Sequence, residues 1–203
     1  MKKDRKRLIR EYAEAILTAL LLALFIRAYI IQAFKIPSGS MIPTLVIGDH
    51  ILVNKFIYGT KIPFSDKRFL IFRKPEKGDI IVFKFPEDPT KDFIKRVIAT
   101  DGDILESRDK VIYVNGKEVK EPYAYHSESF IRQKGSDPRD NFGPIPVPHN
   151  KVFVMGDNRD QSFDSRYWGF VDVKAIKGEA LIIYWSWDSK KWLRFNRIGR
   201  LVQ

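Results

Sequence analysis

The chain has 203 residues, with 36 Lys and Arg against 25 Asp and Glu, so its formal net charge is +11. An apolar content of 44% and a total of 15 Phe, 8 Tyr and 4 Trp exclude an intrinsically disordered protein. The absence of Cys excludes disulfides, cysteine nucleophiles and iron–sulfur clusters, and three scattered His residues do not suggest a metal site. We therefore expect a folded protein with no metal and no other cofactor.

The positive charge is concentrated at the two ends of the chain. Residues 1–10 carry six basic groups and one acidic group, and residues 190–203 carry five basic groups and no acidic group. Residues 11–189 hold 25 basic and 24 acidic groups and are close to neutral. A nucleic-acid-binding domain would carry its excess positive charge on the body of the domain, so we expect no nucleic-acid partner. Basic ends around a neutral body fit a membrane surface.

Residues 12–34 are predicted to form a single transmembrane helix. Their sequence, YAEAILTALLLALFIRAYIIQAF, has Arg27 as its one charge from residue 15 onward. A membrane-spanning helix needs roughly 20 mostly apolar residues, and this segment supplies them. The basic cluster before it predicts a cytoplasmic N-terminus, with the rest of the chain on the outer side of the membrane.

Two other interpretations of this segment fit less well. A cleaved signal peptide would have its small-residue cleavage site after the apolar run, whereas the Ala-x-Ala at Ala13–Ala15 precedes it. A buried amphipathic helix would keep a polar face, which the consecutive Leu20, Leu21 and Leu22 interrupt. The prediction is therefore an uncleaved anchor.

From residue 35 onward the pattern predicts a mainly β domain. Short runs rich in β-branched and aromatic residues alternate with turns, and no long helical period follows the anchor. Asn115–Gly116 predicts a tight hairpin turn, and residues 117–150 are predicted to be loop-rich. The predicted strands are 50–56, 79–85, 93–100, 110–114, 151–155 and 180–185.

The segment IPSGSMIPTL, residues 36–45, is the first candidate site. Two prolines frame Ser38 and Ser40, and Gly39 permits a sharp bend between them. Such a turn can present a hydroxyl and a backbone N–H at one point, as covalent acyl transfer requires. A Pro/Ser/Gly linker between anchor and domain would have the same composition, so this segment alone leaves both interpretations open.

Lys95 is the second candidate. On a strand it shares one face with Phe93 and Val97, while Arg96 points to the other face. Apolar neighbours can desolvate the lysine amine, which lowers its pKa and makes the neutral amine available as a base. A solvated lysine on an edge strand is the alternative.

The third candidate is MGDNRDQSFDSR, residues 155–166, which follows a predicted strand. A solvated loop and a calcium site are both possible, although the spacing lacks the central Gly and the terminal Glu of an EF-hand. Ser162 or Ser165 could orient a neighbouring amine, and Asp164 could pair with Arg166 to hold the loop rigid.

Together these segments resemble the bacterial type I signal peptidases, membrane-bound proteases that use a Ser–Lys dyad to remove signal peptides from exported proteins. The motifs stand in the order of that family and cover most of the chain. They are PSGSMIPTL at 37–45, GDHILVNKFIYG at 48–59, KGDIIVF at 77–83, FIKRVIATDGD at 93–103 and MGDNRDQSFDSRYWGFV at 155–171.

The resemblance implies a fold class and a division of the chain. The fold is mainly β, with a single N-terminal transmembrane helix followed by a β-rich Ser–Lys protease core that carries a small β/loop insertion. The implied parts are a cytoplasmic basic tail at 1–11, the anchor at 12–34, the catalytic core at 35–103 and 151–203, and the insertion at 104–150.

The resemblance also implies residue roles. Ser40 matches the nucleophile, and Lys95 matches the general base that deprotonates it. The Ser38 hydroxyl and the Ser40 backbone N–H match the donors that stabilise the oxyanion, and Ser162 matches the serine that orients the lysine amine. The supporting positions are Arg96, Gly156, Asp164 and Arg166.

The implied substrates are the signal peptides of preproteins, bound as an added β-strand beside Ser40 and cleaved after small residues in an Ala-x-Ala pattern. The implied location is the bacterial cytoplasmic (inner) membrane, with the catalytic domain on the outer, periplasmic or extracytoplasmic, face. The other expected partners are the lipid bilayer and the secretion translocon. The C-terminal cluster is a second expected contact with acidic lipid headgroups, made by Lys190, Lys191 and Arg194 among Trp185, Trp187 and Trp192.

Two other functions compete with this hypothesis. A membrane-tethered β domain without enzymatic activity would explain the anchor and the basic ends, but it gives no reason for Ser40, Lys95 and Ser162 to occur together. A self-cleaving Ser–Lys regulator of the repressor type would be soluble with a DNA-binding N-domain, which the apolar segment at 12–34 disfavours.

Overall fold

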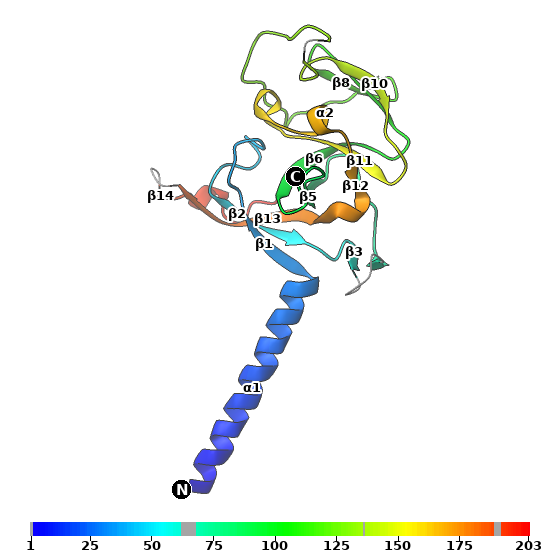
Figure 1. The fold of residues 1–203 in the computed structure, drawn as a ribbon. Coiled ribbons are helices and arrows are strands. Elements are labelled where there is room, and N and C mark those ends of the chain that lie inside the picture. Colours follow the sequence, from blue (N-terminus) through cyan, green and yellow to red (C-terminus); the bar gives the residue numbers. More distant parts are fainter. Residues whose placement is uncertain (1, 62–67, 136, 189–191) are drawn as a thin grey trace.

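A long N-terminal helix and a β domain make up the computed structural model, which describes residues 2–61, 68–135, 137–188 and 192–203. The helix α1 (Lys2–Tyr29) extends away from the β domain (Figure 1). Good helix formers fill it, and the pairs Arg7–Glu11 and Arg10–Glu14 stabilise its first half at i,i+4 spacing. Its side chains from Arg5 to Ala28 are exposed, so α1 packs on no other element along most of its length.

The predicted transmembrane helix is not confirmed. In the described part of the chain, no helix combines the length and the apolarity that crossing a membrane requires. The predicted C-terminal boundary is also wrong, because α1 ends at Tyr29 and residues Ile31–Lys35 form strand β1. The residues of this segment, among them β-branched and aromatic ones, pair with β2. This partner makes the segment a strand, although its local apolar pattern predicts a helix.

A mainly β domain follows, as predicted. Its largest sheet has eight strands, and every pair of neighbours in it is antiparallel. The order is β1 (Ile31–Lys35), β2 (Asp49–Asn54), β13 (Ile176–Asp188), β5 (Ile80–Lys84), β6 (Asp92–Thr100), β11 (Lys151–Met155) and β12 (Val171–Asp172), with β14 (Trp192–Leu193) paired to β13.

Two smaller sheets complete the described β structure. One has the order β10 (Phe142–Pro146), β7 (Ile104–Arg108), β8 (Val111–Val114) and β9 (Lys117–Glu118), and the other pairs β3 (Tyr58–Lys61) with β4 (Arg68–Ile71). The predicted turn at Asn115–Gly116 joins β8 to β9 with positive φ angles of 53° and 75°, a conformation that Asn and Gly tolerate best. The helical turns are η1 (Arg159–Gln161), α2 (Ser165–Trp168), η2 (Val173–Ala175) and η3 (Phe195–Arg197).

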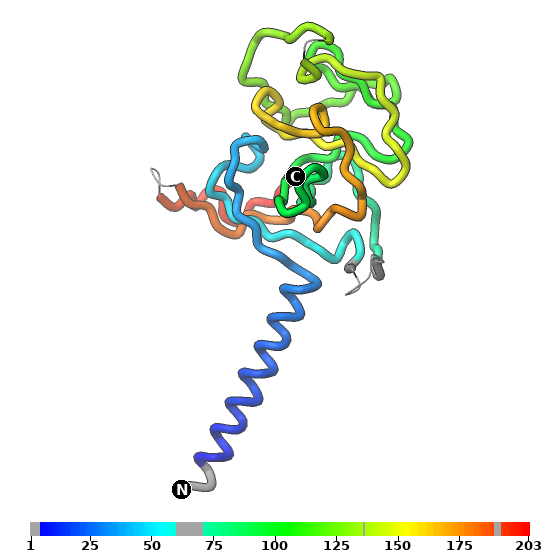
Figure 2. Tube along the Cα trace, viewed as in Figure 1, coloured from blue at the N-terminus to red at the C-terminus, as the bar shows by residue number. Residues whose placement is uncertain are grey.

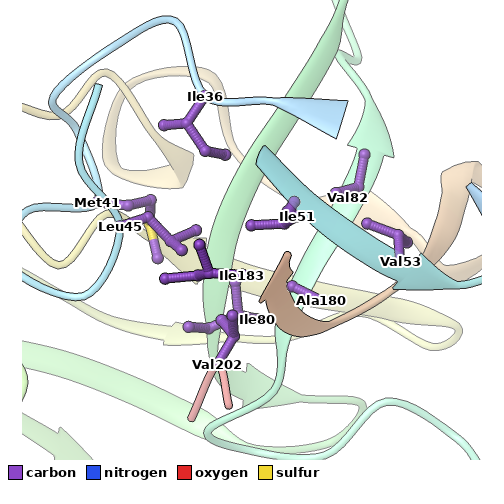
Figure 3. Packing of buried hydrophobic residues seen from close by; sticks show 10 residues of the cluster. All are labelled: Ile36, Met41, Leu45, Ile51, Val53, Ile80, Val82, Ala180, Ile183 and Val202. Carbon is purple, nitrogen blue, oxygen red and sulfur yellow. The ribbon is translucent and has the colours of Figure 1, made fainter. Parts of the chain in front are cut away.

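The segment between β1 and β2 lies over the largest apolar cluster of the core. Figure 2 shows this segment looping out and returning into β2. Its side chains Ile36, Met41 and Leu45 are buried against Ile51 and Ile183 of the main sheet, as Figure 3 shows. Val202, near the C-terminus, closes the same cluster. The core therefore fixes both ends of the turn that carries Ser40.

Arg194 has partners inside the protein, and the predicted lipid contact of the C-terminal basic cluster stays a prediction. The guanidinium of Arg194 donates to the hydroxyl of Ser186 at 2.8 Å and lies 3.4 Å from the buried carboxylate of Asp49. Arg197 binds the same carboxylate at 2.6 Å. A buried carboxylate requires such partners, so these cations hold the fold together. Lys190 and Lys191 lie outside the described residues.

Candidate active site

The turn that carries Ser40 is held from both sides. The backbone N–H of Ile42 donates to Gly39 and that of Leu45 donates to Met41, which gives the segment its tight curvature. Asn158 then ties the turn to the loop after β11, because its backbone N–H donates to the carbonyl of Ser40 and its side-chain amide donates to the carbonyl of Gly39, both at 3.1 Å. The Ser40 hydroxyl therefore has a fixed position, and the interpretation of this segment as a simple linker does not fit.

Lys95 reaches Ser40 from β6. Its Nζ donates a hydrogen bond to Ser40 Oγ at 2.7 Å, although 55 positions separate the two residues in the sequence. Both side chains are nearly enclosed, with 9% of Ser40 and 4% of Lys95 exposed. The structure thus brings the first and second candidates together as a nucleophile and a base in direct contact, the geometry that covalent acyl transfer needs.

The surroundings of Lys95 favour the neutral amine. They lower the pKa of Lys95 to about 8, chiefly because an ammonium loses its hydration on burial, and the charge of the nearby Arg166 acts in the same direction. The carboxylates of Asp164 and Asp157 act in the opposite direction. The alternative of a solvated edge lysine is therefore wrong, and the amine is positioned to accept a proton near neutral pH.

Gly156 packs against the back of this pair. A Cβ at this position would lie 2.2 Å from the hydroxyl oxygen of Ser162 and 2.4 Å from the backbone carbonyl of Ser40. Atoms do not approach so closely, so only glycine lets the Ser162 side chain and the Ser40 turn lie on either side of this backbone. Glycine is required here because any larger side chain would clash, and not because the backbone has an unusual φ angle.

Ser162 is buried beside Gly156, 5% exposed, and its hydroxyl has no hydrogen-bond partner within the described part of the chain. The resemblance implies that this hydroxyl orients the Lys95 amine, and no such bond is present in this structure. A buried hydroxyl without a partner carries a free-energy cost, and catalytic hydrogen bonds often form fully only when substrate is bound.

Asp164 and Arg166 stabilise the loop as predicted. The Asp164 carboxylate caps α2 by accepting from the backbone N–H of Arg166, and it also accepts from the Arg166 guanidinium at 2.8 Å and from the backbone N–H of Gly156 at 3.0 Å. Burial raises the pKa of Asp164, but the charge and hydrogen bonds of Arg166 outweigh burial and lower it overall. Arg166 also donates to the carbonyls of Arg139 and Arg159, so it fixes several chain segments at once.

Arg96 has a partner that sequence reasoning missed. Its guanidinium makes two parallel hydrogen bonds to the carboxylate of Asp157, at 2.9 and 2.8 Å, and the hydroxyl of Thr44 donates to the same carboxylate at 2.5 Å. Both charged side chains are fully buried. Asp157 lies inside the third candidate segment, and the signal for it was Arg96 itself, a cation on the buried face of a strand that requires a counter-charge.

A second buried pair supports the loop from the side of the insertion. Arg159 binds the carboxylate of Glu121 through two hydrogen bonds, at 2.6 and 2.7 Å, and both side chains are buried. The backbone of Arg159 donates to Tyr125. No pattern in residues 117–150 singled out Glu121, because a carboxylate that pairs with a distant arginine looks like any surface acid in the sequence.

A cavity of about 420 Å³ opens over the Ser40–Lys95 pair. Its lining consists of Pro37–Ser40, Asp92–Lys95, Gln161 and Phe163. Ser38 is exposed in this cavity next to Ser40, as the predicted oxyanion donor would have to be. Among the described residues, no group of His, Asp or Glu side chains could hold a metal ion.

Comparisons with known proteins identify a family. The chain matches the protein family described as signal peptidase, peptidase S26, over residues 9–185. It is 35% identical over 230 aligned positions to a signal peptidase I of Pseudomonas fluorescens, which covers 98% of this chain and 81% of that protein. It is 38% identical over 218 positions to a signal peptidase I of Aquifex aeolicus (strain VF5), with 82% and 80% covered. A crystal structure of a signal peptidase I from Enterococcus faecalis V583 is 34% identical and covers 53% of this chain and 97% of that one, with a TM-score of 0.44.

Proposed function

The chain belongs to the signal peptidase family, peptidase S26, and we propose that it removes signal peptides from preproteins through a catalytic dyad of Ser40 and Lys95. Membership makes it a serine protease of the signal peptidase I type. The observation that carries the assignment of the dyad is the 2.7 Å hydrogen bond between Lys95 Nζ and Ser40 Oγ inside a cavity open to substrate.

The reaction begins with a proton transfer between these two groups. The neutral Lys95 amine accepts the Ser40 hydroxyl proton while Ser40 Oγ forms a bond to the carbonyl carbon of the scissile peptide. When the tetrahedral intermediate collapses, the C–N bond breaks and the departing amine of the mature protein takes the proton from Lys95. Water then attacks the acyl-enzyme with Lys95 again as base, which frees Ser40 and the carboxylate of the signal peptide.

The developing negative charge on the carbonyl oxygen needs donors. We assign the Ser40 backbone N–H and the Ser38 hydroxyl to this role, because both residues line the cavity that holds Ser40 Oγ. Loss of one such donor typically costs about 10²–10³ in rate. Ser162 is assigned to orient the Lys95 amine once substrate excludes water, with Gly156 leaving it the necessary space.

The substrate would bind as an added strand. In the described structure β11 pairs with β6 only from Arg96 onward, which leaves the edge of Asp92–Lys95 open toward the cavity. An extended signal peptide between this edge and Pro37–Ser40 would satisfy backbone groups on both walls. Apolar side chains at Phe93 and Ile94 line the cavity and suit the small residues of an Ala-x-Ala cleavage site.

We also propose that α1 attaches the enzyme to the bacterial cytoplasmic membrane, with the β domain on the outer face. The support is the row of exposed apolar side chains from Ile16 to Ile26, which no other described element covers, and the basic residues that precede it. The lipid bilayer would then be a partner of α1, and the translocon would deliver preproteins to the same surface.

The test of the catalytic assignment is cleavage of a preprotein by the full chain in detergent. Ser40→Ala and Lys95→Ala are each expected to lower kcat/KM by about 10³ or more, because each removes a member of the dyad. Lys84→Ala, an exposed lysine on the neighbouring strand, is the matched control and should cleave like the wild type. If either dyad variant cleaves at the wild-type rate and its circular dichroism shows a normal fold, the proposal is wrong.

The test of membrane attachment is fractionation of cells that express the full chain. Retention in the membrane after a carbonate wash, lost in the double variant Leu20→Lys/Leu21→Lys, supports insertion of α1. Release by carbonate contradicts it. Protease added outside spheroplasts should digest the β domain if that domain faces outward.

A further inference from the structure

The side chain of Asn158 has no task in the reaction described so far. It is buried, and its Nδ2 donates to the Gly39 carbonyl at 3.1 Å while its backbone N–H donates to the Ser40 carbonyl at the same distance. Its Oδ1 is buried and has no hydrogen-bond partner in the part of the chain that the structure describes. A buried acceptor without a partner costs free energy. The NH₂ group is therefore the part of this side chain that the site uses.

Asn158 holds one end of a peptide group whose other end is the proposed oxyanion donor. The peptide bond between Gly39 and Ser40 is trans, so the Gly39 C=O and the Ser40 N–H lie in one plane and point in opposite directions. The carbonyl accepts from Asn158 Nδ2 at 3.1 Å and from the Ile42 N–H at 3.2 Å. Among the described residues, none accepts a hydrogen bond from the Ser40 N–H. Two bonds on the carbonyl thus fix the direction of an N–H that stays available to a substrate.

The position of Asn158 is fixed in turn by the insertion. Tyr125 pairs with it in a parallel bridge, in which the Tyr125 N–H donates to the Asp157 carbonyl at 2.7 Å and the Arg159 N–H donates to the Tyr125 carbonyl at 2.9 Å. These bonds hold the residues directly before and after Asn158, and the Gln161 N–H donates to the carbonyl of Asn158 itself at 3.1 Å. A donor that is held in place before the reaction stabilises developing charge without having to reorganise.

The contribution of this contact grows as negative charge develops on the substrate. A hydrogen bond to the Gly39 oxygen polarises the peptide group and makes the Ser40 N–H a stronger donor, and such linked bonds strengthen one another by about 10–30%. The scissile carbonyl oxygen carries little charge when the substrate binds and a full charge in the tetrahedral intermediate. An interaction that strengthens along this path lowers the barrier and leaves substrate binding unchanged. Loss of the Asn158 side chain should therefore reduce kcat and not KM.

We propose that Asn158 is a positioning residue for the oxyanion site, whose side-chain amide acts through the Gly39–Ser40 peptide to aim and polarise the Ser40 N–H. This inference rests on the proposed function and adds to it a residue that does not itself touch the substrate. Gly39 and Ser40 line the cavity, whereas Asn158 does not belong to its lining. Its effect on the reaction passes through the peptide group that it holds.

The first test is cleavage of a preprotein by the full-length Asn158→Ala variant in detergent. We expect kcat to fall by about 10- to 100-fold, less than the loss of a whole donor would cause, and KM to change by no more than about twofold. The acid limb of the pH profile should not move, because the burial of Lys95 and the charges of Asp164 and Arg166, which act on its pKa, all remain. If Asn158→Ala does not fold, Asn158→Ser serves the same purpose, because its hydroxyl is too short to reach the Gly39 carbonyl.

The second test measures oxyanion stabilisation without turnover. In a peptide aldehyde, the aldehyde carbon takes the place of the scissile carbonyl. Ser40 Oγ bonds to this carbon, the Ser40 proton moves to Lys95, and the aldehyde oxygen becomes an oxyanion. The matching peptide alcohol cannot form this adduct and reports binding alone. In Asn158→Ala the advantage of the aldehyde over the alcohol should shrink by the same factor as kcat, while the alcohol binds as it does to the wild type.

Asn141→Ala provides the matched control. The side-chain amide of Asn141 also donates to a backbone carbonyl, that of Arg132 at 3.0 Å, and Asn141 does not line the cavity. This variant therefore loses the same kind of hydrogen bond away from the Ser40 turn. Its kcat, its KM and its preference for the aldehyde over the alcohol should match those of the wild type.

Three results would overturn the positioning role. They are a wild-type kcat in Asn158→Ala, a lower kcat with an unchanged advantage of the aldehyde over the alcohol, and a shift of the acid limb, which would mean that Asn158 acts on Lys95 instead. Failure of the proposed function looks different, because then the wild type does not cleave the preprotein or Ser40→Ala cleaves it equally well, and the positioning role falls with it.

Discussion

Arg96 and Asp157 form a buried ion pair that ties strand β6 to the loop after β11. Two parallel hydrogen bonds of 2.9 and 2.8 Å join the guanidinium to the carboxylate. Lys95 directly precedes Arg96 on β6, and Gly156 directly precedes Asp157. The Arg96–Asp157 pair therefore sets the distance between the proposed base and the loop that supports it. The catalytic geometry thus depends on a contact that takes no part in the chemistry.

We expect Asp157→Asn to lower the free energy of unfolding by about 3–5 kcal/mol, because it leaves the Arg96 cation buried without a counter-charge. Urea denaturation of the full chain measures this. Asp88→Asn is the control, since Asp88 pairs with Lys91 on the surface and its loss should not shift the midpoint measurably. A midpoint for Asp157→Asn equal to that of the wild type would show that the pair does not hold the loop.

Gly156→Ala should lower kcat by about 10² or more. The added methyl would lie 2.2 Å from Ser162 Oγ and 2.4 Å from the Ser40 carbonyl, so either Ser162 or the Ser40 turn has to move, and displacement of a catalytic group by about 1 Å has an effect of this size. Preprotein cleavage measures the rate.

Gly102→Ala separates this effect from backbone strain. Gly102 has a φ of 81° and nothing within 4 Å of the added methyl, so its substitution strains the backbone without touching the site. We expect Gly102→Ala to reduce stability by about 1–2 kcal/mol and to leave kcat as in the wild type. Equal losses of kcat in both variants would mean that Gly156 matters only for folding.

Lys95→Met should make the protein more stable while it abolishes cleavage. With the pKa of Lys95 at about 8 when folded and 10.5 when unfolded, folding carries a penalty of about 3 kcal/mol at pH 7, and an apolar side chain of similar volume removes most of it. The unfolded chain binds the proton more tightly, so wild-type stability rises as the pH increases from about 8 to 10.5.

The stability advantage of Lys95→Met should therefore be largest below pH 8 and disappear above about pH 10.5. Thermal unfolding of both proteins at pH 7 and at the highest pH they tolerate measures it. A Lys95→Met variant less stable than the wild type at pH 7 would show that the buried lysine contributes to the fold.

The strands could be predicted from local pattern, and the anchor boundary could not. Each predicted strand is present, because alternation of apolar and polar residues between turns reports the faces of a sheet directly. Local pattern assigns residues 31–34 to the anchor helix because their apolar run continues that of α1, and only pairing with β2 makes Ile31–Lys35 a strand. Strands β7 and β10 in the insertion were missed, because β10 contains Gly143, Pro144 and Pro146, which resemble a loop.

The site shows the same division between local and distant information. Ser40 and Lys95 were identified from motifs, and the structure places them in contact. Their supporting partners Asp157 and Glu121 were missed, since an ion pair between residues far apart leaves no periodic signal in the sequence. The partners of Arg194 could not be predicted for a similar reason, because nothing local reveals that Asp49 is buried beside it.

The contacts of Arg194 lead to a prediction of their own. Arg194→Gln is expected to lower the free energy of unfolding by about 1–3 kcal/mol, because it removes a charged hydrogen-bond donor from the Ser186 and Asp49 cluster. Binding of the full chain to vesicles of anionic lipid should not change. Weaker vesicle binding with unchanged stability would instead support the predicted lipid contact of this residue.

The most direct measurement of the central claim is the pH dependence of kcat/KM for preprotein cleavage by the wild type. Catalysis needs the neutral amine of Lys95, so the rate should rise tenfold per pH unit on the acid side and level off around pH 8, the pKa that burial gives this amine. An acid limb centred near pH 6.5, the ordinary range of histidine, or a rate independent of pH between about 6 and 9, would contradict the assignment of Lys95 as the base.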